Sequence, residues 1–256
     1  MSSEVRMVKT IAAAICGAVV CGSGTAFAQV PTMWQDKIFV NISFGGTTGS
    51  KDATQQFNFP YLEETATLDI STPVKGGGLF DFTAGAMVYE NWAAGISWSR
   101  HSANSNATFT GSIPDTIFPD NSRTVTGELT DMVHKENWFA LLGAYLLPKL
   151  PGMPKFMENV DIMVFAGPVR AGVEHEIVSN VTVTESPSGP VVTADRQVVD
   201  KGFWGIQVGA DFRYMFTKNI GAGGFLRFSG ASGDISEFVN LDLGGFQGGA
   251  GVRFKF

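Results

Sequence analysis

The side chains best suited to acid–base or nucleophilic chemistry are three histidines and their polar neighbours. Ser99 precedes His101 by two residues, so both side chains share one face if this stretch is extended. Glu174 and Glu176 flank His175, and His134 is the third histidine. A general base needs such a partner within about 3 Å of the group it activates. A spacing of two is common by chance, however, and we expect the chain not to be an enzyme.

The sequence contains no pattern that predicts a metal site, a cofactor site or a nucleic-acid site. The spacings of the three histidines match no metal-ligand motif, so we predict no metal site and no cofactor. The glycine-rich segment 244–251 resembles a phosphate-binding loop, but no helix can follow it before the chain ends. The formal net charge is −6, which argues against a nucleic-acid partner because such partners require a basic face.

The first segment of the chain has the pattern of a secretory signal. Arg6 and Lys9 precede an apolar run, and Ala26 and Ala28 then form an A-x-A cleavage site. We therefore predict a cleaved signal peptide over 1–28 and a single domain over 29–256. Both cysteines lie in the removed segment, so no disulfide stabilises the exported protein.

The remaining chain alternates between apolar and polar residues with a period of two, which predicts β-strands. The clearest segment is 204–214, in which Trp204, Ile206 and Val208 oppose Gly205, Gln207 and Gly209. The segments 136–147 and 160–173 are apolar on both faces, and their facing stays open. The eight predicted strands are 37–46, 79–89, 92–101, 136–147, 160–173, 204–214, 220–230 and 246–256.

The connections between these segments also alternate, between short and long. Glu90-Asn91 and Thr217–Asn219 are short turns, and 148–159 is a longer, proline-rich turn. The other connections are long, polar loops over 47–77, 102–135, 174–200 and 231–243. Short stretches within them, such as 108–110 and 123–126, could extend the strands. This sorting is typical of outer-membrane barrels, in which periplasmic turns are short and extracellular loops are long. We predict an all-β fold, an eight-stranded antiparallel up-and-down transmembrane β-barrel.

An eight-stranded barrel has an interior just wide enough to be filled by side chains. The charged residues predicted to face it are Asp81, Asp211, Arg213, Arg227 and Arg253. Unpaired buried charges cost several kcal/mol, so we expect these residues to pair as a structural plug. A proton or ion path through the interior is the alternative.

Aromatic residues cluster where the strands would cross the two membrane surfaces. Interfacial girdles of rings are typical of membrane barrels, although aromatic residues also favour strands in general. The predicted girdle residues are Tyr89, Trp92, Trp98, Trp204, Tyr214, Phe216 and Phe256.

The signal peptide, the eight alternating segments and the C-terminal Val252, Phe254 and Phe256 together resemble the small OmpA/OmpX-like outer-membrane β-barrels of Gram-negative bacteria. The resemblance covers 37–256 and implies a location in the outer membrane. It also implies contact with outer-membrane lipid and lipopolysaccharide. The three C-terminal residues would be a recognition signal for the barrel assembly machinery.

The function that we predict is structural: a largely plugged barrel that displays four long extracellular loops, with a surface ligand whose identity the sequence does not give. One alternative is an OmpW-like carrier of small hydrophobic molecules, for which Phe39, Leu141, Met163 and Phe165 are the apolar inward candidates. A second alternative is a barrel enzyme that modifies lipid A, which would need Ser99 and His101 to face lipid.

Overall fold

The structure, a computed structural model, describes 37–49, 52–61, 64–115, 121–149, 159–186, 189–236 and 239–256. The predicted signal peptide, with Ala26 and Ala28, lies outside the described residues. The described part is almost entirely antiparallel strand. Within it, no helix has the length and apolar character needed to cross a membrane.

The described chain forms ten strands. Their bounds are β1 Ile38–Thr47, β2 Ala53–Tyr61, β3 Glu64–Thr72, β4 Gly77–Tyr89, β5 Trp92–Pro114, β6 Ser122–Leu146, β7 Val160–Ser186, β8 Gly189–Met215, β9 Ile220–Ser236 and β10 Val239–Lys255.

Eight of the strands form a closed ring in which each strand is antiparallel to its neighbours. The order is β1, β4, β5, β6, β7, β8, β9 and β10, and β10 pairs back onto β1. Each of these eight strands covers one of the eight segments predicted from alternation, except for one terminal residue in three of them, at 37, 147 and 256. The predicted eight-stranded, antiparallel, up-and-down barrel is therefore confirmed.

Glycines line the seam where the ring closes. Gly45 lies opposite Gly249, and Ser43 lies opposite Gly251. A Cβ atom at Gly251 would collide with the carbonyl oxygen of Ile42 on the neighbouring strand. The lack of a side chain at this position therefore lets β10 approach β1 closely enough for the ladder hydrogen bonds that close the ring.

The prediction of long loops is wrong for most of their length. The segment 47–77 contains the hairpin β2–β3, and β3 pairs with the outer part of β5 through residues 67–71. The hairpins β5–β6, β7–β8 and β9–β10 extend far beyond the ring, so the strand extensions at 108–110 and 123–126 are confirmed. Many residues of these arms are Thr and Val, whose branched side chains favour extended backbone.

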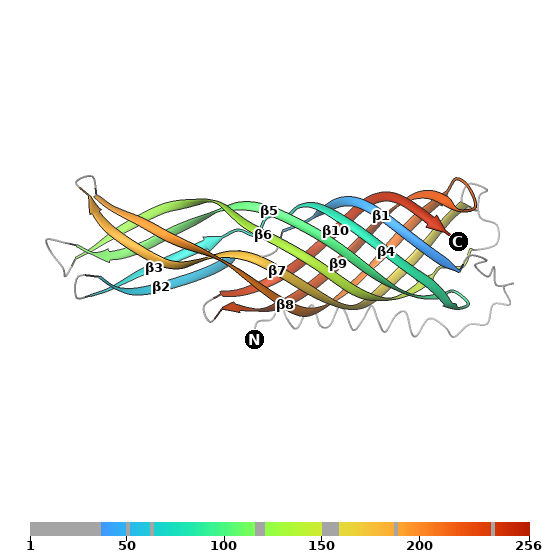
Figure 1. The fold of residues 1–256 in the computed structure, drawn as a ribbon, viewed down its shortest axis with the longest axis horizontal. Coiled ribbons are helices and arrows are strands. Elements are labelled where there is room, and N and C mark those ends of the chain that lie inside the picture. The colour runs from blue at the N-terminus through green and yellow to red at the C-terminus, as the bar shows by residue number, and fades with distance from the viewer. Residues whose placement is uncertain are drawn as a thin grey trace. The chain divides into compact units, whose positions relative to one another are not determined.

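A second apolar core holds the extended hairpins together. Its buried members on β3 and β5 include Leu68, Ile70 and Phe109, and Met132 and Val178 join them from β6 and β7. In Figure 1 the tips of β2–β3, β5–β6 and β7–β8 lie at the end of the barrel away from the C-terminus. The sorting of short turns to one end and long connections to the other follows from this arrangement.

Candidate functional site

Arg227 lies at the centre of a hydrogen-bonded cluster inside the barrel, in which all three of its side-chain nitrogens have an acceptor. Its Nη1 donates to Asp81 Oδ2 at 2.6 Å and its Nη2 donates to Ser99 Oγ at 2.7 Å. Its Nε donates to Gln247 Oε1 at 2.6 Å. All four residues are buried. The cluster joins β4, β5, β9 and β10 across the interior, so it fills the interior and ties non-adjacent strands together.

A second cluster lies nearer the short turns, where two arginines share one aspartate. Arg253 Nη2 is 2.8 Å from Asp211 Oδ2, and Arg213 Nε donates to the other oxygen of Asp211. Arg253 also donates to Ser43 Oγ at 2.8 Å, and the guanidinium of Arg213 lies 4.6 Å from the centre of the Phe39 ring. The structure therefore brings Asp81 together with Arg227, and Asp211 together with Arg213 and Arg253.

The three histidines meet inside the barrel, near the start of the long hairpins. His134 Nδ1 lies 3.0 Å from His175 Nδ1, and its Nε2 lies 2.8 Å from Glu136 Oε1. Trp138 Nε1 donates to the other oxygen of Glu136 at 2.7 Å, and His101 packs beside His134 with ring centres 6.4 Å apart. Sequence spacing missed this cluster because the pairing of β6 with β7 joins residues 41 positions apart.

The cluster lies where the outer surface of the barrel is charged. Lys135 and Glu174, which point outward beside it, form an ion pair at 2.9 Å. Burial is the main cause that lowers the pKa of His175 to about 4, and the neighbouring His134 contributes the rest of this shift. Burial raises the pKa of Glu136, but hydrogen bonds from His134 and Trp138 outweigh that effect and the net pKa is below its ordinary value.

Chemistry at these histidines is restricted by burial. His101, His134 and His175 are each at most 2 % exposed. Ser99 and His101 do share a face, as predicted, but the Ser99 hydroxyl is bound by Arg227 and His101 lies 3.3 Å from the carbonyl oxygen of Gly78. Among the residues that the structure describes, no three His, Cys, Asp or Glu side chains are placed to hold a metal ion.

The outer surface of the ring carries a belt of apolar side chains. All seven residues predicted as girdles point outward, with exposed fractions between 41 % for Trp98 and 71 % for Trp204. Val252 on β10 and Phe256, which follows the strand, are exposed, and Phe254 is partly buried. On β8 the belt runs from Trp204 to Tyr214. The ten steps between these residues span about 25 Å at roughly 3.3 Å per residue and a tilt of about 40°.

The structure resolves the facing of the two ambiguous strands. On β6, Trp138, Ala140 and Leu142 face inward, whereas Leu141 is 54 % exposed on the outside. The assignment of Leu141 to the interior is therefore wrong, because an apolar residue fits either the packed interior or the apolar belt. Met163, Phe165 and Phe39 do face inward.

No protein-family model and no curated protein matches the chain. Among solved structures, it is similar to the outer membrane protein OprG from Pseudomonas aeruginosa, with a TM-score of 0.48 and 11 % identity over 89 % of this chain and 99 % of that chain. It is also similar to the outer membrane protease OmpT from Escherichia coli, with a TM-score of 0.46 and 11 % identity over 91 % of this chain and 100 % of that chain. For Neisserial surface protein A the TM-score is 0.38 and the identity is 12 %, over 86 % of this chain and 97 % of that chain. No property of these proteins is carried over to this chain at TM-scores below 0.5 and identities of 11–12 %.

The buried Arg227–Asp81 pair predicts a characteristic mutational pattern. Arg227→Leu leaves Asp81 as an uncompensated buried charge and should lower the free energy of unfolding by about 3–5 kcal/mol. The double variant Arg227→Leu/Asp81→Leu removes both charges and should recover much of this loss. Denaturant titration of the folded barrel in detergent micelles measures both values. Arg170→Leu, at an exposed arginine, is the control and should change stability by less than about 0.5 kcal/mol. A double variant that is less stable than Arg227→Leu would contradict the expected pairing.

The depressed pKa of His175 predicts acid sensitivity. The folded barrel holds His175 neutral down to a pKa of about 4, whereas the unfolded chain protonates it near 6.5. Its contribution to stability is therefore complete above pH 6.5 and is lost as the pH falls toward 4, by roughly 3 kcal/mol. His175→Gln should reduce the difference in unfolding free energy between pH 7.5 and pH 4 by that amount. An unchanged difference in this variant would show that His175 does not carry the effect.

Proposed function

We propose that this chain is an integral outer-membrane β-barrel with a structural, surface-display role. The observation that carries the proposal is the inverted distribution of side chains in the ring. Arginine, aspartate and glutamine side chains are buried inside, while Trp, Phe, Ile and Leu side chains cover the outside. A soluble barrel would expose its charges to water, whereas this arrangement suits a hydrocarbon surround.

The dimensions and the closure of the ring support the same proposal. An apolar belt of about 25 Å agrees with the outward-facing band of known membrane barrels. The pairing of β10 with β1 leaves no open sheet edge within the belt, as a hydrocarbon environment requires. Outer-membrane lipid, lipopolysaccharide and the barrel assembly machinery, acting on Val252, Phe254 and Phe256, are the partners that we expect.

The packed interior favours display over transport. The Arg227 cluster and the Asp211 cluster each span the ring, and Arg213 occupies the space against Phe39 and Met163. An OmpW-like carrier would need an apolar cavity at this level, and these apolar residues instead pack against a charged side chain. The inward Ser99 and His101 likewise favour a non-enzymatic role over modification of lipid A.

The display role predicts which end of the barrel is outside the cell. A protease recognition sequence inserted beside Gly189, between β7 and β8, should be cleaved by protease added to intact cells of a Gram-negative host. The same sequence inserted at Thr217–Asn219 should be cleaved only after the outer membrane is opened, because the protease cannot cross that membrane. Cleavage restricted to the second site would reverse the proposed orientation.

The plugged interior predicts the electrical behaviour of the barrel. The native chain should give no steady, large openings in a planar lipid bilayer, because charged side chains fill its narrow interior. Arg227→Ala/Asp81→Ala removes the pair without leaving one buried charge alone, but the Asp211 cluster still spans the ring, so this variant should give no steady, large openings either. Steady, large openings by the native chain would instead favour an ion path.

A further inference from the structure

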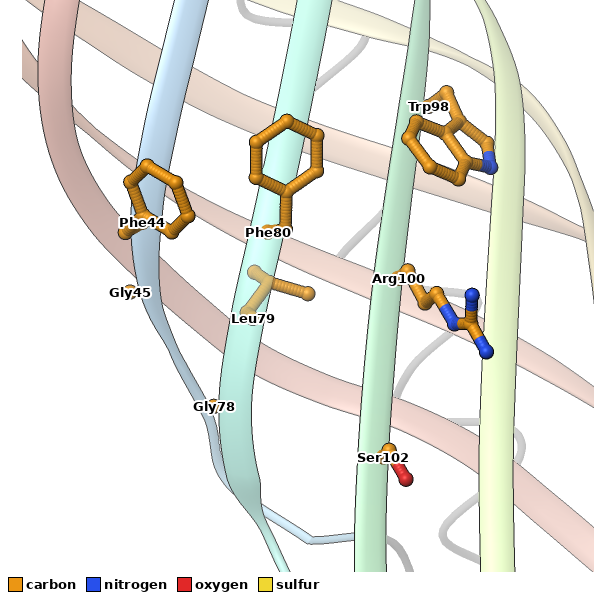
Figure 2. Close-up of a pocket in the computed structure, with 8 residues that line it drawn as sticks. All are labelled: Phe44, Gly45, Gly78, Leu79, Phe80, Trp98, Arg100 and Ser102. Atoms are coloured by element: carbon orange, nitrogen blue, oxygen red, sulfur yellow. The ribbon is translucent and has the colours of Figure 1, made fainter.

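A hollow lies on the outside of the barrel, at the border between the apolar belt and the polar hairpins. It has a volume of about 440 Å³ and is formed by β1, β4 and β5. Figure 2 shows the three aromatic side chains of Phe44, Phe80 and Trp98 on one side of it and Arg100 and Ser102 farther along β5.

The aromatic side of the hollow is a packed row of rings that crosses three strands. The centres of Phe44 and Phe80 are 5.1 Å apart, and those of Phe80 and Trp98 are 5.8 Å apart, both in edge-to-face arrangements. Phe44 is 68 % exposed and Trp98 is 41 % exposed. This row therefore offers a preformed apolar surface to a ligand that approaches from outside the barrel.

The hollow exists because side chains are missing beside the rings. Gly78 lies opposite Gly46 on the neighbouring strand, and these two outward positions are next to the pair formed by Phe80 and Phe44. A Cβ atom added at Gly78 would meet no atom within 4 Å. The space is therefore open, and a larger residue at position 78 would fill it without disturbing the backbone.

Arg100 supplies a positive charge at the edge of the hollow. It is the first charged outward residue of β5 after Trp92, Ala94, Ile96 and Trp98. The described residues offer it no hydrogen bond and no ion pair, and its side chain is exposed. A carboxylate that interacts with Arg100 through its charge is that of Glu174, which already forms an ion pair with Lys135 at 2.9 Å. The guanidinium is thus free to bind an anion.

We propose that this hollow binds a phosphate-bearing acyl lipid of the outer leaflet, an inference that rests on the proposed membrane location. The acyl chain would lie against Phe44, Phe80 and Trp98, and the phosphate would accept hydrogen bonds from Arg100. The planar guanidinium matches phosphate oxygens well, and lipid phosphates lie at this border of a membrane. A two-fold contact between two copies through the same hollow would bring two Arg100 side chains together and is therefore disfavoured.

Quenching of Trp98 fluorescence by brominated lipid tests this site. Trp34→Phe, Trp92→Phe and Trp204→Phe leave Trp98 and the buried Trp138, and a further Trp98→Phe chain gives the background from Trp138. The probes are phosphatidic acid and phosphatidylcholine with brominated acyl chains, each diluted into unbrominated phosphatidylcholine vesicles. Half-maximal quenching should need about tenfold less brominated phosphatidic acid than brominated phosphatidylcholine, because the phosphate of phosphatidic acid carries no compensating choline.

Two variants should remove this preference and two matched variants should keep it. Arg100→Ala removes the charge, and Gly78→Leu fills the hollow. Arg170→Ala removes another exposed arginine on β7, and Gly143→Leu adds a leucine to the outer belt where its Cβ meets only the Ala166 carbonyl oxygen at 3.7 Å. Folding of every variant is checked by its circular dichroism.

The outcomes separate this inference from the proposed function. Equal quenching by both lipids, or an equal loss of preference in Arg170→Ala and Arg100→Ala, would overturn the lipid site while leaving membrane insertion intact. Quenching by neither lipid in the parent chain would contradict insertion itself. If both lipids quench Trp98 only at low protein density, a second copy of the chain covers the hollow at high density. This outcome would also overturn the proposal.

Discussion

A sheet that closes on itself has no edge, and in this chain closure depends on nine residue pairs between β1 and β10. These pairs satisfy the backbone groups of the first and the last ring strand at once. They also set the register for the whole ring, because a slip of one residue would exchange the inward and outward faces. The glycines at 45, 249 and 251 allow the two strands to come together. The interior, the outer belt and the hairpins all follow from that register.

Closure encloses charged side chains in a narrow space, and their pairing then becomes necessary. Each of the three side-chain nitrogens of Arg227 donates to a partner on a different strand. Arg213 and Arg253 converge on Asp211. Such clusters do not by themselves increase stability greatly, because removal of the charges from water offsets much of their attraction. Their consequence is specificity, since a changed register would leave a charge without its partner.

Beyond the belt, the chain builds a second structure on the same strands. The histidine cluster with Glu136 marks the transition, and the apolar core around Leu68, Phe109 and Met132 follows. Near the tips, Glu185 joins Tyr61 and Arg123, with oxygen–donor distances of 2.6 Å to each. The long connections are thus packed hairpins that would present ordered surfaces, and the hollow beside Arg100 lies where these hairpins meet the belt.

The sequence by itself determined the number of ring strands, their approximate bounds and the faces of those that alternate clearly. It also identified the five interior charges and the exposed aromatic residues, because alternation along an extended strand is a local property with a period of two. Leu141 was assigned to the wrong face because β6 is apolar on both sides. Polar composition likewise concealed the hairpins, in which Thr and Val alternate around a second core.

Only the tertiary structure decided which residues meet. Ser99 joins Arg227 across 128 positions, and His134 joins His175 across 41. The hollow beside Arg100 is formed by residues of three strands, β1, β4 and β5, and Gly78 leaves part of it open. Contacts of this kind depend on strand order and register, which are set by pairing between distant segments. A local pattern fixes the face of each residue, but not the neighbour that it meets on that face.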